Sequence, residues 1–281
     1  MDHVADNETS LTGSLAKGLA VLAVFGPDNP SMGVSEIARR VQINRATAYR
    51  IVSALTSLGF LEQIDRGGGR REYRPGLKVL LLGRAALESL ELPELALPYL
   101  QQLQAQFGET VNMAILDEAS IVYILRLKTA IIVNIRLFVG SRLSAHCTSM
   151  GKAMLAFLPE DELETIIAQI DFQALTERTI RTREQLLGDL DDVRRLGFAV
   201  NDQELALGLR SVAAPVFNRQ KVVAAINIAV PAGRAGYDRV SQDLGPAVRN
   251  TAQRISNALS ELTSPEISMP GGVLGREASR R

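Results

Sequence analysis

Residues 34–59 of this 281-residue chain carry polar side chains of the kinds that bind DNA. Arginine, asparagine, serine and threonine side chains hydrogen-bond to phosphates and to base edges. Asn44 stands at a predicted helix N-cap, so Arg45 and Thr47 fall in the first turn, the part of a recognition helix that meets DNA. The residues expected to contact DNA here are Ser35, Asn44, Arg45, Ala46, Thr47, Tyr49 and Arg50.

The opposite side of the same predicted helix is apolar. Its residues follow the i, i+3, i+4, i+7 spacing of a helix that faces a core. Two short helices around a tight turn, with such a second helix, are typical of a helix-turn-helix. The alternative is a plain helical hairpin whose arginines form a solvated face, because short motifs also match by chance. The positions expected to face the core are Ala48, Ile51, Val52, Leu55 and Leu58.

A β-hairpin is predicted directly after these helices. A β-prone run at residues 60–64 and an extended run at 72–74 flank the glycine-rich turn 65–71. A hairpin in this place is a wing, and its arginines can reach phosphates or a minor groove. We expect three of them to do so: Arg66, Arg70 and Arg71.

Charge is concentrated in the same part of the chain. Residues 14–74 hold nine lysines and arginines against five acidic residues, whereas the whole chain has 31 of each. A neutral protein with one basic segment is typical of a DNA-binding head on an ordinary body.

Composition argues against several other classes of protein. No apolar run approaches a membrane span, and the first residues lack a secretory signal pattern. A single cysteine, Cys147, excludes an intramolecular disulfide and fits a reducing cytoplasm. The neighbouring His146 and Cys147 could contribute to a zinc site, but no second pair at ligand spacing accompanies them. We therefore expect a cytoplasmic protein without a metal or cofactor.

Changes of pattern predict five segments. We expect a disordered tail at 1–10, a winged helix-turn-helix at 11–75, a linker helix at 76–92, an effector-binding domain at 93–262 and a loose tail at 263–281. Leucines at helical spacing mark the linker, and Pro93 is expected to break it. In the effector-binding domain we predict helices at 94–107, 148–158, 160–170, 183–196 and 238–262. We predict strands there at 110–116, 120–127, 131–139, 198–200, 210–217 and 221–230. This order describes an α+β domain on one antiparallel sheet.

Several motifs, in their order, resemble those of the IclR family of bacterial transcription regulators. They cover residues 11–262 and read SLAKGLAVLAVF, VSEIARRVQINRATAYRIVSALTSLGFLE, the wing, AHCTSMGKAMLAFLP, and VNDQELALGLRSVAAPVFN with VVAAINIAVP. The stretches RLKTAIIVNI and GSRLSAHCTSMGKAMLA are most similar to the PcaR/PobR branch. That branch controls the catabolism of aromatic acids through the β-ketoadipate route.

The resemblance implies a winged helix-turn-helix, a linker helix and a GAF-like effector domain whose antiparallel sheet and loops enclose a small-molecule pocket. Two positions depart from common family forms: Asn201 replaces a frequent aspartate and Ala229 a frequent serine. These changes disfavour a small oxo-acid and favour a larger, flatter acid. The pocket residues that the resemblance implies are Ser149, Met150, Asn201, Ser211, Asn227 and Ala229.

The residues themselves offer further groups for a carboxylate. Thr148 and Ser149 open a predicted helix whose N–H groups could seat an anion, although either hydroxyl could simply cap that helix. Arg126, Arg136 and Arg142 are candidate carboxylate partners, although arginines on strands are more often surface residues.

Together these features predict a regulator in which a small carboxylic acid controls binding to operator DNA or contact with RNA polymerase. A homodimer or a dimer of dimers would place two heads on two half-sites. An alternative effector is a sugar acid, glyoxylate or a purine catabolite. A DNA-tethered enzyme with Cys147 as nucleophile and His146 as its neighbour is a further alternative, but adjacent residues on an extended segment point to opposite faces. We therefore do not expect an enzyme.

Overall fold

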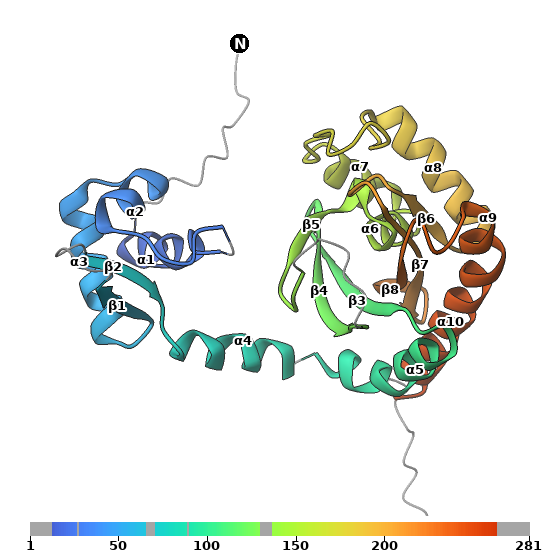
Figure 1. The fold of residues 1–281 in the computed structure, drawn as a ribbon, viewed down its shortest axis with the longest axis horizontal. Helices are drawn as coiled ribbons and strands as arrows, with labels where there is room; N and C mark the ends of the chain where they lie inside the picture. Colours follow the sequence, from blue (N-terminus) through green and yellow to red (C-terminus); the bar gives the residue numbers. More distant parts are fainter. Residues whose placement is uncertain (1–12, 27, 66–70, 89, 130–136, 263–281) are drawn as a thin grey trace, which may run out of the picture. The chain divides into compact units, whose positions relative to one another are not determined.

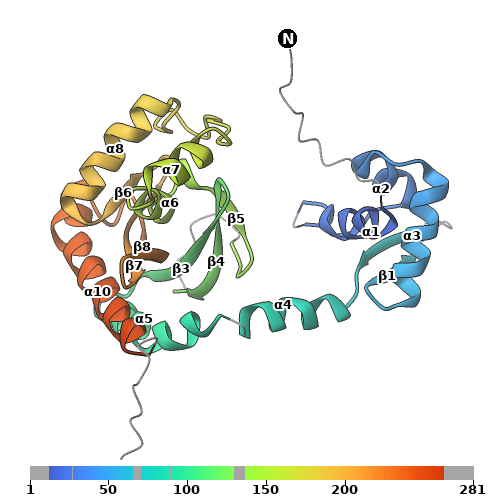
Figure 2. The same ribbon diagram turned by 180° about the vertical axis from the view of Figure 1, so that it is seen from behind.

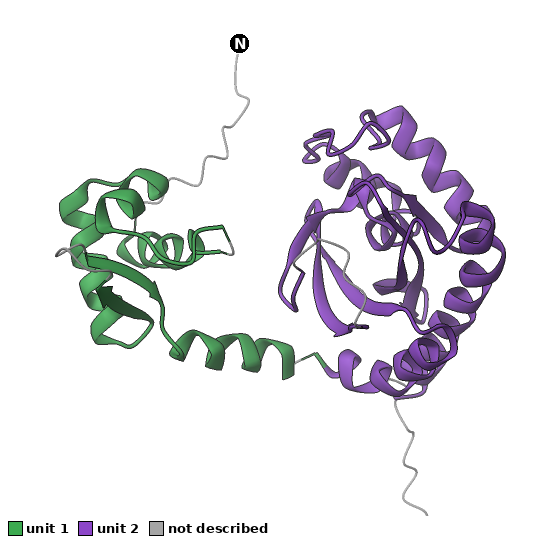
Figure 3. Ribbon diagram, in the orientation of Figure 1, with its two compact units in different colours: residues 1–90 green, residues 91–281 purple. Residues whose placement is uncertain are grey.

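The computed structural model of the protein describes residues 13–26, 28–65, 71–88, 90–129 and 137–262 (Figure 1). The chain divides into two compact units, Met1–Leu90 and Glu91–Arg281 (Figure 3). The division falls two residues before the expected start of the effector domain. None of the described helices is both long and apolar enough to span a membrane.

The first unit is a winged helix-turn-helix. Its core joins the helices to the hairpin through Val21, Ile37, Val52, Leu61 and Tyr73, all of them buried. The strands pair antiparallel. Its elements are α1 (Ser14–Ala23), α2 (Val34–Val41), α3 (Arg45–Ser57), β1 (Leu61–Asp65), β2 (Arg71–Pro75) and α4 (Lys78–Glu88).

Backbone conformation fixes one turn of this unit, and a close backbone contact fixes another. Gln42 ends α2 in the left-handed conformation, with φ of 57°, and so turns the chain toward α3. Where the chain leaves the hairpin, a Cβ at Gly76 would lie 2.4 Å from the carbonyl oxygen of Gly59, so only glycine fits. One expectation was wrong. Leu58 does not face the core but is 56% exposed, because α3 ends at Ser57 and the chain turns there.

The second unit is built on one six-stranded antiparallel sheet in the order β5-β4-β3-β8-β7-β6. Its strands are β3 (Thr110–Asp117), β4 (Ser120–Leu127), β5 (Arg142–Ser144), β6 (Ala199–Asp202), β7 (Leu209–Asn218) and β8 (Lys221–Pro231). Its main helices are α5 (Glu91–Phe107), α6 (Ser149–Leu155), α7 (Glu160–Ile167), α8 (Arg183–Leu196) and α10 (Gly245–Leu262).

Helices cover both faces of the sheet (Figures 1 and 2). Ala114, Ala213 and Ala225 pack in one cluster with residues of α6, α7 and α8. Strand residues that alternate with these, such as Val212 and Ile226, are also fully buried and face the other way, where α10 and α5 lie. The alanines let α6 approach the sheet closely.

Two predictions in this unit differ from the structure. α5 begins at Glu91 and carries Pro93 in its first turn, where a backbone N–H has no partner within the helix and proline is tolerated. The predicted strand at 131–139 lies largely outside the described residues, and 137–139 form no strand; a short strand lies at Arg142–Ser144 instead. The predicted helix at 238–262 is confirmed within one residue: it runs without a break through α9 (Tyr237–Arg239), a π-helical turn at Val240–Leu244 and α10.

Candidate DNA-binding and effector-binding sites

Helix α3 presents the predicted DNA-binding face. The side chain of Asn44 accepts a hydrogen bond of 2.8 Å from the backbone N–H of Thr47, which confirms the predicted N-cap. Ala48 and Val52 are buried on the inner side of the helix. The outer side is exposed at Arg45, Ala46, Tyr49 and Arg50, and Ser35 is exposed on the neighbouring α2.

The arginines of this unit differ in their partners. Arg39 and Arg40 form ion pairs with Glu36 at 2.7 Å. Among the residues that the structure describes, the side chains of Arg45 and Arg50 form no ion pair or hydrogen bond. Their charges are therefore available to an external anion.

The wing is described only in part. Arg71 is exposed at the start of β2, next to the turn. Arg66 and Arg70, both expected to contact DNA, lie outside the described residues. Further along β2, Arg74 pairs with Glu62 on β1 at 2.8 Å, which ties the two strands together.

The two hydroxyl side chains at the start of α6, Thr148 and Ser149, have different partners. The hydroxyl of Thr148 caps the helix, accepting a hydrogen bond of 3.1 Å from the N–H of Gly151. Ser149 does not cap; its hydroxyl is 2.7 Å from the hydroxyl of Ser211 on β7, and both residues are buried. Met150 is fully buried in the apolar cluster beneath α6.

Gly151 allows α6 to pack closely against the turn that precedes it. A Cβ at this position would lie 2.2 Å from the carbonyl oxygen of Ala145. The motif therefore needs glycine here for a steric reason. Any larger residue would push the start of α6, and Ser149 with it, away from its present position.

Most of the predicted effector residues on strands share one face of the sheet. Directly paired residues on neighbouring antiparallel strands point to the same face, as do residues two apart along a strand. The register joins β4, β3, β8, β7 and β6 in this way, and the Ser149–Ser211 contact places the face beneath α6. We call this set the polar row: Arg126, Asn112, Asn227, Ala229, Ser211 and Asn201.

Asn112 was missed by sequence reasoning. It is 2% exposed, and its Nδ2 donates a hydrogen bond of 2.7 Å to Oδ1 of Asn227. It also lies directly opposite Arg126 on β4. A lone asparagine in an apolar strand gives little signal in the sequence, and only the register shows that it faces two predicted site residues.

Arg126 is the one predicted carboxylate partner that the structure places in this row. Its guanidinium lies 5.1 Å from the centre of the Tyr123 ring. Burial lowers the pKa of Arg126 and raises the pKa of Tyr123 to about 12. Among the described residues, Nε and Nη1 of Arg126 are buried without a hydrogen-bond partner. Arg142 instead pairs with Asp117 at the surface, and Arg136 lies outside the described residues.

Asn201 closes the other end of the polar row. Its Nδ2 donates a hydrogen bond of 2.5 Å to the carbonyl oxygen of Cys147. Its Oδ1 is buried and finds no partner among the residues described. The Cys147 carbonyl can only accept, so the orientation of this amide is fixed.

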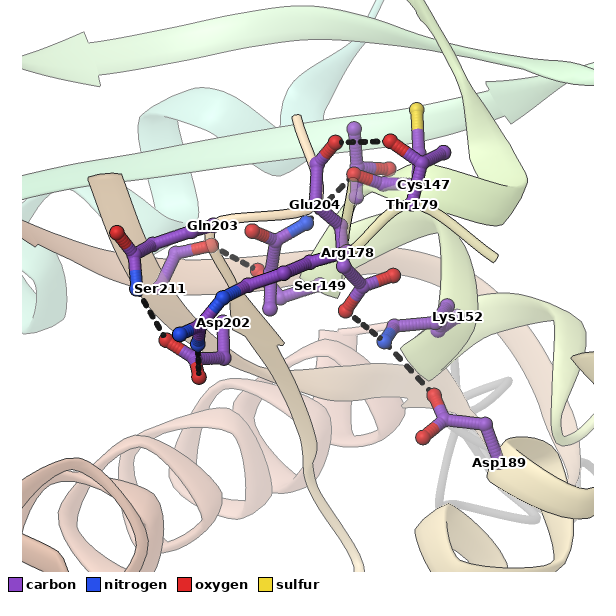
Figure 4. A network of polar contacts seen from close by, with 12 residues as sticks. Cys147, Ser149, Lys152, Arg178, Thr179, Asp189, Asp202, Gln203, Glu204 and Ser211 are labelled. Carbon is purple, nitrogen blue, oxygen red and sulfur yellow. Dashed lines mark hydrogen bonds and ion pairs between the residues drawn. The ribbon is translucent and has the colours of Figure 1, made fainter. Parts of the chain in front are cut away.

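A buried ionic cluster lies one helical turn beyond Ser149 (Figure 4). The Nζ of Lys152, which is 1% exposed, is 2.6 Å from Oε1 of Glu204 and 2.7 Å from Oδ2 of Asp189. Burial alone would lower the pKa of Lys152, but the two carboxylates outweigh it and raise that pKa. The cluster joins α6, α8 and the segment after β6, and sequence reasoning missed it.

The connection between α7 and α8 is held to the same segment (Figure 4). The hydroxyls of Thr176 and Thr179 donate to the carbonyl oxygens of Gln203 and Glu204, at 2.8 and 2.7 Å. Nearby, Arg178 pairs with Asp202 at 2.5 Å. The backbone after Asn201 is therefore fixed from two sides.

Comparisons with known proteins identify the family in which this helix-turn-helix is joined to this C-terminal domain. A model of the IclR helix-turn-helix domain matches residues 14–65, and one of the C-terminal part of the bacterial transcriptional regulator IclR matches residues 84–257. The chain belongs to the IclR family. The family and the α+β fold with its winged helix-turn-helix and antiparallel sheet, both expected from the sequence, are thus confirmed.

Several IclR relatives match most of this chain. It is 35% identical over 248 residues to the Pca regulon regulatory protein of Pseudomonas putida, a match covering 88% of this chain and 84% of that protein. It is 34% identical over 254 residues to the AllR repressor of Escherichia coli strain K12, covering 90% and 92%. A solved transcriptional regulator from Rhodococcus sp. RHA1 is 40% identical, with a TM-score of 0.75 and coverage of 89% and 98%.

The Pca regulatory protein and the AllR repressor regulate transcription, which confirms the expectation of a regulator rather than an enzyme. The Pca regulator among them is consistent with the PcaR/PobR branch. Local chemistry agrees, because burial raises the pKa of the Cys147 thiol to about 11 and so disfavours the nucleophilic thiolate. The Nδ1 of His146 lies 2.7 Å from the hydroxyl of Ser144. Within the described residues, no group of His, Cys, Asp and Glu side chains could hold a metal ion.

Proposed function

We propose that this IclR-family protein is a cytoplasmic, sequence-specific regulator in which a carboxylic acid controls operator binding or activation of transcription. The effector is an aromatic acid or an intermediate of its catabolism. One observation carries the proposal: the buried, unpaired donors of Arg126 face a row of polar groups beneath α6. A guanidinium is suited to a planar carboxylate. The Pca regulator among the relatives supports the aromatic class.

In this proposal the operator is bound by the first unit. The exposed arginines of α3 contact base edges and phosphates, and the wing arginines add phosphate contacts. The unpaired state of Arg45 and Arg50 supports this role, because neither must give up an internal ion pair in order to bind DNA.

We further propose that the protein acts as a homodimer or a dimer of dimers. Helix α4 has no buried residue, although five leucines lie on it or directly before it. Exposed apolar groups of this size are typical of interaction surfaces. A second copy of the chain would cover them and place two heads on the half-sites of a near-palindrome. These leucines are Leu77, Leu80, Leu81, Leu82 and Leu87.

The proposal is tested with DNA and acids together. The full chain selects its preferred duplex from a random library, and duplex affinity is then measured with benzoates, sugar acids, glyoxylate and allantoin-type compounds. We expect an aromatic acid to change duplex affinity by about 5- to 150-fold, the usual range of coupling between two sites. If a sugar acid or glyoxylate changed it and no benzoate did, the proposed effector class would be wrong. If no acid changed either duplex affinity or transcription by RNA polymerase from a promoter beside that duplex, effector control itself would be refuted.

A further inference from the structure

We propose that the effector is a hydroxylated carboxylic acid whose carboxylate binds Arg126 and whose hydroxyl group binds Asn112. This rests on the proposed function, which concerns the carboxylate alone. It goes beyond that function by assigning a second group on the ligand, and a residue that recognises it.

The unpaired buried atoms of the polar row include both hydrogen-bond donors and acceptors, which points to a ligand that both donates and accepts hydrogen bonds. Buried polar atoms in folded proteins almost always have partners, so an atom without one within the protein calls for a partner from outside, such as a water, an ion or a ligand. Within the described part of the chain, three residues of the polar row have such unpaired atoms. Arg126 offers N–H donors, whereas Asn112 and Asn201 each offer a carbonyl oxygen. A carboxylate can only accept hydrogen bonds, so it can pair with the N–H donors but not with the carbonyl oxygens.

Asn112 and Arg126 are placed to bind one small molecule. They lie directly opposite each other on β3 and β4, and neighbouring strands are about 4.8 Å apart. Although they face each other, no hydrogen bond joins the Asn112 oxygen to the guanidinium. A ligand that carries both a carboxylate and a hydroxyl group can pair with both residues.

A hydroxyl group on the ligand can pair with the Asn112 amide in either of its orientations. In the present one, Nδ2 bonds to Asn227 and Oδ1 is left for a ligand. Turning both amides would keep a bond between the two asparagines and leave an N–H group instead. A hydroxyl group donates and accepts, so it pairs with either. At Asn201 the orientation is fixed by the Cys147 carbonyl, and the unpaired atom there is an acceptor.

The test compares acids that differ only in a hydroxyl group. Dissociation constants of the full-length protein are measured by calorimetry for benzoate, 3-hydroxybenzoate and 4-hydroxybenzoate, and for butanoate and 3-hydroxybutanoate. We expect the best hydroxy acid to bind about tenfold more tightly than its parent acid, because a buried polar group otherwise stays unpaired. In Asn112→Leu, which keeps the branched shape of the side chain but has no polar atom, this preference should fall to about onefold while the parent acid still binds.

Thr251→Val is the matched control. Thr251 is another buried polar residue, but it lies on α10, where its hydroxyl bonds to the carbonyl oxygen of Ala247. This variant should keep the tenfold preference. Equal binding of acids and hydroxy acids by the wild-type protein would overturn the inference and leave the proposed function intact. Binding of neither would overturn both. A preference that survives in Asn112→Leu would refute the role of Asn112.

Discussion

The two units contain unpaired arginines in opposite settings. Arg45 and Arg50 are exposed on α3, where water and salt surround them. Arg126 is half-buried beside Tyr123, with two nitrogens out of contact with solvent. A solvated cation gains little from any single anion but adds to the binding of a long polyanion. A desolvated cation gains much more from one small anion. The same side chain thus suits DNA in one unit and a metabolite in the other, and burial decides which.

We expect the largest effect from replacing the exposed arginines of α3, which should change DNA binding but not acid binding. Arg45→Ala combined with Arg50→Ala should weaken binding of the selected duplex about a thousandfold, because each specific arginine contact contributes roughly 1–3 kcal/mol. Acid binding, measured by calorimetry on the same protein, should not change. Arg84→Ala is the control, since Arg84 is also exposed but pairs with Glu88 on α4. Unchanged duplex affinity in the double variant would mean that α3 is not the recognition helix.

The next effect concerns the buried ionic cluster, which has no counterpart among the described contacts of the head. Lys152→Met should reduce the unfolding free energy of the second unit by about 3–5 kcal/mol, because it leaves the Glu204 carboxylate buried and unpaired. Burial already raises the pKa of Glu204, so its protonation on acidification should reduce the loss as pH falls. Urea unfolding between pH 5 and pH 8 measures both.

Arg194→Met controls for the cluster. Arg194 also joins α8 to α6, through a hydrogen bond of 2.7 Å to the carbonyl oxygen of Ala156, but it is partly exposed and lies at the far end of α6. We expect a loss of about 1 kcal/mol, with no change between pH 5 and pH 8. Equal losses in the two variants would argue against a special contribution from the buried charges.

Two glycines test how closely α6 must approach its neighbours. Gly151→Ala should reduce stability by about 1–3 kcal/mol and weaken acid binding, because the new Cβ meets the Ala145 carbonyl and displaces Ser149. Gly188→Ala, in α8 with open space around it, should instead stabilise the protein by up to about 1 kcal/mol. Thermal unfolding and calorimetry distinguish them. Full acid affinity in Gly151→Ala would show that the position of α6 does not matter to the ligand.

We expect the smallest effect from replacing the wing arginines, which should lower the salt dependence of DNA binding but not that of acid binding. Replacing Arg66, Arg70 and Arg71 with alanine should weaken duplex binding for all sequences and reduce the slope of log affinity against log salt by about 2–3. Acid binding to the buried site should depend only weakly on salt in the wild-type protein and in the variant. An unchanged slope for the duplex would mean that the wing does not contact phosphates.

Local patterns were enough to predict the head, because the N-cap at Asn44 and the spacing of Ala48 and Val52 depend on neighbours in sequence. Leu58 was misassigned because the helix ends one residue earlier. In the second unit most elements were predicted, but the site depends on long-range register. Asn112 meets Asn227 across 115 residues, and Lys152 meets Glu204 across 52. No periodicity encodes such pairings. The family resemblance and the residue types supplied the predicted site residues, and Asn112 and Lys152 were missed.

In the proposed regulator, a site for DNA and a site for an acid, one in each unit, are coupled. The direct test measures the affinity of the best-binding hydroxy acid with and without saturating selected duplex, and the affinity of the duplex with and without saturating acid. We predict that both affinities change by the same factor, between about 5 and 150, because coupling between two binding sites is reciprocal. Independent binding of the two ligands would contradict the account.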